Sequence, residues 1–274
     1  MKRAAVNLAL LFFALLVVFF SIWGPEALAR YKDKGVLNQI RLQQEEGEGE
    51  AYRYRLSQNE KLFILSQCLN AQTLPESDQS ALTRETETGY QDLAGTYAFV
   101  VNRKGPSGGE ITDEEIYVAC SSGIEELTEL GILPEGIRQV QPSAYDATLY
   151  SAIDVPEPRN NVAVWKMSLS NSQMNANKEN RLLDAYIDAD DGRIYEFYVR
   201  TPLRWEEIDT DKMIEKWSEY MGLDKPGEYE TDNPLLETTP YYKKYAFDGA
   251  GNERTIVTIG FYEGINELFL KISK

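Results

Sequence analysis

Apolar and polar residues alternate along residues 161–200, and this alternation predicts three antiparallel strands. The strands are expected at 162–167, 183–188 and 193–199. The second and third are separated by Ala-Asp-Asp-Gly at 189–192, which has the composition of a tight turn. Asp tolerates turn dihedrals and Gly accepts a positive φ, so we expect a hairpin at this point.

Three other stretches have the period of amphipathic helices. Ser57 with Glu60, and Thr112 with Glu115, have the spacing of capping boxes, and Asp209 is a suitable N-cap for a third helix. Apolar residues then recur three and four apart. They are Leu62, Phe63, Leu65, Cys68 and Leu69 in the first helix, Ile116, Ala119, Cys120, Ile124, Leu127 and Leu130 in the second, and Met213, Ile214, Trp217 and Met221 in the third.

The fold class predicted from these elements is α+β, with antiparallel sheets and packed helices. A further strand is expected at 97–101, and a closing meander at 241–247, 255–261 and 267–272, joined by glycine turns. A capped helix is thus followed by a meander twice, once in 112–200 and again in 209–273. Two related helix-plus-meander units are one hypothesis, and meanders that arose independently are the other.

The N-terminal segment is predicted to cross a membrane. Residues 4–23 carry no charge and correspond to about 30 Å of helix, the thickness of a hydrocarbon core. Lys2 and Arg3 favour a cytoplasmic N-terminus, which places the bulk of the chain on the extracytoplasmic side. Residues along the segment would contact lipid, among them Ala4, Leu10, Leu16, Phe20 and Trp23.

A cleaved signal peptide is the alternative for this segment. Ala27-Leu28-Ala29 has the A-x-A pattern of a cleavage site, and cleavage after Ala29 would release a secreted protein. The apolar run is longer than an ordinary signal-peptide core, and this length favours an uncleaved anchor.

The sequence suggests four regions after these assignments. Residues 1–29 are the anchor or signal segment, and 30–56 form a polar spacer with an acidic, glycine-containing run at 45–50. Residues 57–204 form an α+β region, and 205–274 form a helix followed by a three-stranded meander.

Composition narrows the chemistry that the chain can perform. The net charge of −16 opposes binding to nucleic acid. The chain contains no histidine, which excludes Ser-His-Asp and Cys-His catalysis and histidine zinc sites. No pair among the 44 acidic residues has a distinctive spacing, and the glycine-rich stretch 105–109 lacks the pattern of a phosphate-binding loop. We therefore predict no catalytic residues, no metal and no cofactor.

Two residue groups leave alternatives open. Asp188, Asp190 and Asp191 could suggest calcium, but Gly192 comes too early for an EF-hand and no Glu stands at the twelfth position, so the turn is favoured. Cys68 and Cys120 are the only cysteines. They could form a disulfide in an oxidising compartment, or they could be two buried free thiols.

Two motifs stand out within residues 112–200. They are Trp-Lys-Met-Ser-Leu at 165–169 and Leu-Asp-Ala-Tyr-Ile-Asp-Ala-Asp-Asp-Gly-Arg-Ile at 183–194. Together they resemble the PepSY module of bacterial secreted and membrane proteins. The resemblance implies a non-catalytic role, binding or regulating a protein or peptide of the bacterial cell envelope. An envelope hydrolase that uses carboxylates and a structural or assembly component are the two alternatives.

Overall fold

The computed structural model describes residues 53–72, 97–170, 173, 180–230, 237–249 and 253–274. The predicted membrane segment at 4–23 and most of the spacer lie outside these residues. Within the described ranges, no helix is long and apolar enough to cross a membrane. Residues 49–274 form one compact unit, and the described residues all belong to it.

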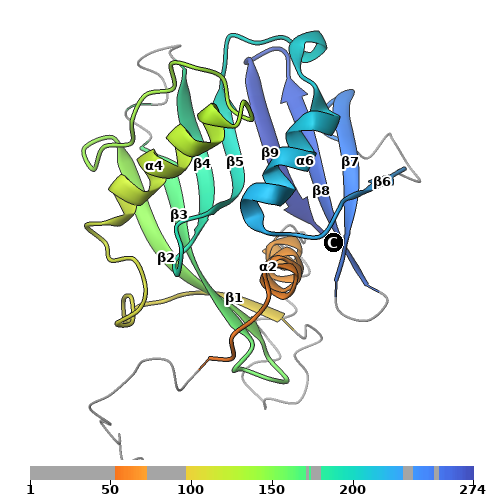
Figure 1. Cartoon of the computed structure of the whole chain (residues 1–274). Helices are drawn as coiled ribbons and strands as arrows, with labels where there is room; N and C mark the ends of the chain where they lie inside the picture. Colours follow the sequence, from red (N-terminus) through yellow and green to blue (C-terminus); the bar gives the residue numbers. More distant parts are fainter. Residues whose placement is uncertain (1–52, 73–96, 171–172, 174–179, 231–236, 250–252) are drawn as a thin grey trace, which may run out of the picture. The chain divides into compact units, whose positions relative to one another are not determined.

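A single antiparallel sheet forms the centre of this unit (Figure 1). Its nine described strands follow the order β1-β2-β3-β4-β5-β9-β8-β7-β6. The strands are β1 (Tyr97–Val101), β2 (Tyr145–Asp154), β3 (Asn161–Leu169), β4 (Arg181–Asp188), β5 (Ile194–Arg200), β6 (Gly227–Tyr229), β7 (Tyr241–Asp248), β8 (Arg254–Tyr262) and β9 (Glu267–Ser273). The predicted α+β class and antiparallel pairing are confirmed.

Among the described residues, three α-helices pack against the sheet. They are α2 (Gln58–Gln72), α4 (Ile116–Glu129) and α6 (Thr210–Met221), and a short 3-10 helix, η1 (Trp205–Glu207), precedes α6. The predicted capping residues form their hydrogen bonds at the start of α2 and α6 and in the turn that leads into α4. The Ser57 backbone N–H donates to Glu60 Oε2 at 2.8 Å, and the Thr112 N–H donates to Glu115 Oε2 at 3.1 Å. Asp209 Oδ1 accepts the N–H of Lys212 at 3.1 Å.

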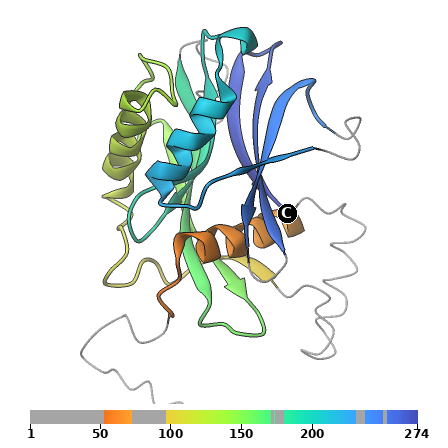
Figure 2. The ribbon, with the colours of Figure 1, turned by 45° about the vertical axis from the view of Figure 1, so that its right-hand side comes forward.

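The helices α4 and α6 lie side by side over the sheet (Figures 1 and 2). The first lies over β2 to β4, and the second over β9 and β8. Gly123 allows α4 to approach β5, because a Cβ there would lie 3.1 Å from Ile194 Cδ1. On α6, the Trp217 ring meets the Phe247 ring of β7 edge-on, with centroids 5.9 Å apart.

Helix α2 lies across one end of the sheet and connects strands that are distant in sequence (Figures 1 and 2). It contacts β1, β2 and β3 on one side and β8 and β9 on the other. Phe63 packs edge-on against Tyr97 of β1 at 6.0 Å, and Ser66 Oγ lies 3.4 Å from Thr255 Oγ1 of β8. The helix therefore joins the two halves of the sheet.

The regions 57–204 and 205–274 contribute to the same sheet. Strands β5 and β9 pair between them, with Phe197 opposite Leu270 and Arg200 opposite Glu267. In each region a helix precedes an antiparallel meander, α4 before β2 to β5 and α6 before β7 to β9. Strand β6, which pairs with β7, is not among the strands that the sequence predicts.

Candidate functional site

The predicted turn between β4 and β5 is confirmed, and its aspartates bond to their own backbone. The Gly192 N–H donates to the Asp188 carbonyl at 3.0 Å, and Gly192 has φ of 78°. Asp188 Oδ1 accepts the N–H of Asp190 at 2.8 Å, and Asp191 Oδ1 accepts the N–H of Arg193 at 3.0 Å. The turn chemistry thus accounts for the local run of Asp and Gly. In the described part of the chain, no three acidic or cysteine side chains are grouped so that they could hold a metal ion.

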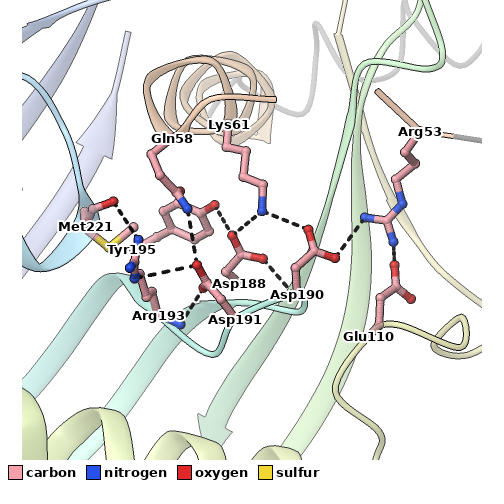
Figure 3. Close-up of polar contacts among 10 residues, drawn as sticks. All are labelled: Arg53, Gln58, Lys61, Glu110, Asp188, Asp190, Asp191, Arg193, Tyr195 and Met221. Atoms are coloured by element: carbon pink, nitrogen blue, oxygen red, sulfur yellow. Dashed lines mark hydrogen bonds and ion pairs between the residues drawn. The ribbon is translucent and has the colours of Figure 1, made fainter. Parts of the chain in front are cut away.

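Asp188 also belongs to a buried cluster that sequence reasoning missed (Figure 3). Lys61 on α2 places its Nζ 2.8 Å from Asp188 Oδ2 and 2.8 Å from Asp190 Oδ2. The Tyr195 hydroxyl donates to the same Asp188 oxygen at 2.6 Å. Asp188 and Tyr195 are both fully buried. One carboxylate therefore joins a helix, a turn and a strand.

A β-bulge brings Tyr195 to this position. Ile187 pairs with Ile194, but the preceding residue of β4, Tyr186, pairs with Glu196, so Tyr195 is an extra residue in β5. Such a bulge redirects the side chains beside it. The local sequence pattern predicts neither the bulge nor the long-range contact with Lys61.

Burial and charge set the protonation of this cluster. Burial raises the pKa of Asp188, and the ammonium of Lys61 opposes that rise. Burial alone would lower the pKa of Lys61, but the carboxylates of Asp188 and Asp190 outweigh it and raise this pKa above its ordinary value. Burial also raises the pKa of Tyr195 well above its usual range, so its hydroxyl remains a donor.

Two arginines extend the polar contacts around the turn (Figure 3). Arg193 Nη1 donates to the Met221 carbonyl at the end of α6 at 3.1 Å, and its Nε lies 3.6 Å from Asp191 Oδ2. Arg53 forms an ion pair with the buried Glu110 and lies 3.6 Å from Asp190. These charged groups thus pair with other residues of the same chain, and they hold together the segments that meet at the turn.

Glu196 is another buried carboxyl, and the sequence did not single it out. Its side chain is 4% exposed and accepts the Ile272 N–H at 2.9 Å. This contact lies just beyond Phe197 and Leu270, where the pairing of β5 with β9 ends. Burial raises the pKa of Glu196 to about 7, although the hydrogen bond from the Ile272 N–H and the nearby charge of Lys271 both act to lower this pKa.

Aromatic rings pack beside Glu196 on the sheet. Phe269 of β9 stacks on Tyr198 of β5 at 5.6 Å and on Tyr262 of β8 at 4.9 Å. Gly260 makes room for the central ring, since a Cβ there would lie 2.3 Å from the Phe269 Cζ. The two tyrosines therefore serve as packing partners of Phe269.

The two cysteines are free thiols, and the disulfide alternative is not formed in the structure. Cys68 on α2 is buried and lies 3.4 Å from the Ala98 carbonyl of β1. Cys120 lies on the buried face of α4. Burial raises the pKa of both thiols to about 12. They pack as small hydrophobic side chains on two different helices.

A groove of about 360 Å³ runs along the outer side of α4. Residues of α4 and of the turn before it form one wall, and Gln139, Val140 and Pro142 form the other. Val118 lies in the groove and is 69% exposed, the highest value among the exposed large hydrophobic residues of the described chain. The groove offers an apolar surface with acidic residues beside it, in contrast to the internally paired charges around Asp188.

Comparison with protein-family models, with curated proteins and with solved structures finds no match to this chain.

Proposed function

We propose that the protein is a non-catalytic binding or regulatory protein of the cell envelope, and that it contacts its partner through the α4 groove. The observation that carries this proposal is the exposed Val118 in a groove between α4 and residues 139–142. Binding sites are commonly concave surfaces of about 300–1,000 Å³ that are lined by apolar side chains with a few polar groups, and this groove falls in that range.

The positions of the carboxylates support binding over hydrolysis. Asp188 is fully buried and already accepts bonds from Lys61 and Tyr195. The two groove glutamates, Glu114 and Glu125, are eleven residues apart along α4 and the turn before it, which corresponds to about 16 Å. Paired carboxylates of glycosidases are separated by only about 5–9.5 Å. A carboxylate hydrolase is therefore the less favoured alternative.

The proposal includes an extracytoplasmic location, with residues 4–23 as the anchor in the lipid bilayer. It rests on the length of that apolar segment and on the PepSY resemblance. Secretion after cleavage at Ala29 is the alternative. The pairing of β5 with β9, each at the end of a helix-plus-meander segment, also supports the hypothesis of two related units.

Site-specific photo-crosslinking of the full chain in membranes of the native host tests the proposed function. A crosslinker at Val118 should give a discrete adduct with another protein. The matched control is a crosslinker at Ile265, which is 54% exposed in the β8–β9 turn, away from the groove. The same adducts at both positions, or none at Val118, would count against a binding role of the groove. An adduct between two copies of the chain would favour the assembly alternative.

A further inference from the structure

One wall of the α4 groove is a regular stripe of side chains. It consists of Glu114, Tyr117, Val118, Ser121, Ser122 and Glu125, whose spacing of three and four residues places them in a row along α4 and its entry turn. The buried face of the same helix is a different row, with Ile116, Cys120, Ile124 and Leu127. Helix α4 therefore has one face for the core and a second for the groove.

The opposite wall is fixed to this stripe by hydrogen bonds. Ser121 Oγ accepts the Val140 N–H at 3.1 Å, and Gln139 Nε2 donates to Glu125 Oε1 at 3.2 Å. The segment around Val140 is thus held against α4 before any partner binds. A preformed groove loses less conformational entropy on binding than one that must be ordered.

Charge is distributed unevenly along the groove. Its apolar part lies between Glu114 at one end and Glu125 at the other, and none of its lining residues is basic. Helix α4 itself contains no Lys or Arg, whereas Glu125, Glu126 and Glu129 lie in its second half. Between its two negative ends, the groove therefore presents the apolar surface of Tyr117 and Val118 beside the hydroxyls of Ser121 and Ser122.

From this geometry we propose that the groove binds an extended, cationic peptide segment of the partner. The segment has two basic residues about five positions apart and apolar side chains between them. The spacing follows because Glu114 and Glu125 are separated by about 16 Å, which an extended chain spans in about five residues. The basic residues pair with the two glutamates, and the apolar side chains cover Val118 and the half-buried Tyr117. This inference rests on the proposed function and adds the chemistry of the partner.

Charge complementarity favours this occupant over other classes. Nucleic acid and anionic lipid surfaces would meet like charge at both ends of the groove and a chain whose net charge is −16. A second copy of this chain would bring the same negative charge. A cationic peptide instead gains two ion pairs at the rim and buries apolar surface in the middle.

The test is a binding titration of the full chain in detergent micelles with dye-labelled peptides, followed by fluorescence anisotropy. The probe is an eight-residue peptide with lysines five positions apart and valines between them. A matched peptide with glutamate in place of lysine controls for charge, and a peptide with the two lysines adjacent controls for spacing. The lysine-spaced peptide should bind most tightly, and its affinity should fall as salt is raised.

Two variants of the protein make the test specific for the groove. The double substitution Glu114→Gln/Glu125→Gln should weaken binding about three- to tenfold, because it removes two exposed ion pairs. Glu215→Gln/Glu219→Gln removes the same charge from exposed positions of α6 and should leave the affinity unchanged. Val118→Asp should also weaken binding of the lysine-spaced peptide, because it removes the apolar side chain that the peptide's valines cover.

Several results would overturn the inference. It fails if the lysine-spaced peptide does not bind, if it binds no better than the control peptides, or if the α4 and α6 double variants bind equally. It also fails if sedimentation shows a dimer that Val118→Asp dissociates, because the occupant would then be a second copy. If the crosslinker at Val118 gives an adduct in membranes but the peptide does not bind, only the choice of occupant is overturned. If the crosslinker at Val118 gives no adduct, the proposed function itself is overturned.

Discussion

Lys61 and Asp188 are 127 residues apart in the chain, yet the Lys61 ammonium lies 2.8 Å from the Asp188 carboxylate. This ion pair connects α2 to the turn between β4 and β5 and is shielded from water. Asp188 is fully buried, and the Lys61 side chain is 12% exposed. Breaking such a pair from one side leaves an uncompensated charge in a medium that solvates it poorly.

We therefore expect Lys61→Met to lower the free energy of unfolding by about 3 kcal/mol. Urea unfolding of the full chain, followed by tryptophan fluorescence, measures the change. Adding Asp188→Asn to Lys61→Met should recover part of the loss, because the stranded carboxylate is then neutral. The control is Lys243→Met, whose partners Asp211 and Glu228 are exposed, and it should cost less than about 1 kcal/mol. If Lys61→Met and Lys243→Met lowered the free energy of unfolding equally, the Lys61–Asp188 ion pair would not behave as a buried one.

The pH dependence of stability should contain a contribution from Glu196. Burial raises the pKa of Glu196 in the folded chain to about 7, above the ordinary value of 4.5. The folded state then binds a proton more tightly than the unfolded state. The stability from this group is therefore fully present below about pH 4.5 and is lost as the pH rises through 7.

Comparison of the unmodified chain with Glu196→Gln isolates this contribution. Glutamine can still accept the Ile272 N–H but does not titrate, so the other ionisable groups cancel in the difference. Between pH 4.5 and 8, the unmodified chain should lose on the order of 3 kcal/mol of stability relative to the variant. Unfolding midpoints in urea across this range provide the measurement. Parallel profiles for the two proteins would show that Glu196 is not held protonated.

The sequence predicts the elements whose causes are local. The capping boxes at Ser57 and Thr112 and the N-cap at Asp209 form with the expected partners, since each involves residues three apart. The glycine at 192 likewise takes the positive φ that its turn requires. Helices and hairpins of this kind can be derived from spacing and composition.

The buried polar contacts follow from tertiary packing, and the sequence does not predict them. Asp188 appears on a turn-rich stretch, and only the position of α2 brings Lys61 to it. Glu196 falls at a strand position that alternates with apolar residues, as a solvent-facing residue would, yet it is buried beside the end of the β5–β9 pairing. The groove stripe on α4 can be found on a helical wheel, but the wall formed by residues 139–142 cannot.

Gly260 of β8 should not tolerate a side chain. A Cβ at this position would lie 2.3 to 2.9 Å from three ring atoms of Phe269, which is too close for any real contact. Gly260→Ala must displace that ring from its stacks with Tyr198 and Tyr262, and we expect a loss of about 1–3 kcal/mol.

Gly108→Ala is the matched control for this substitution. No atom lies within 4 Å of the Cβ position at Gly108, so alanine should have little effect there or stabilise the chain slightly by restricting the unfolded state. Thermal unfolding followed by near-ultraviolet circular dichroism would report both stability and the aromatic packing. If Gly260→Ala left both unchanged, the close packing of Phe269 over β8 would be disproved.

The two cysteines provide a direct test of packing under α2 and α4. Both thiols are fully buried, and burial raises the pKa of each to about 12. The thiolate is the reactive form, so both should resist a disulfide reagent in the native chain and react at once in guanidinium chloride. The reagent 5,5′-dithiobis(2-nitrobenzoic acid) counts accessible thiols by absorbance. Cys68→Ala and Cys120→Ala, measured separately, assign any reactive thiol to its helix. If one thiol were labelled quickly in the native chain, its helix would open locally. If neither thiol were labelled after unfolding in the absence of reductant, the two cysteines would form a disulfide.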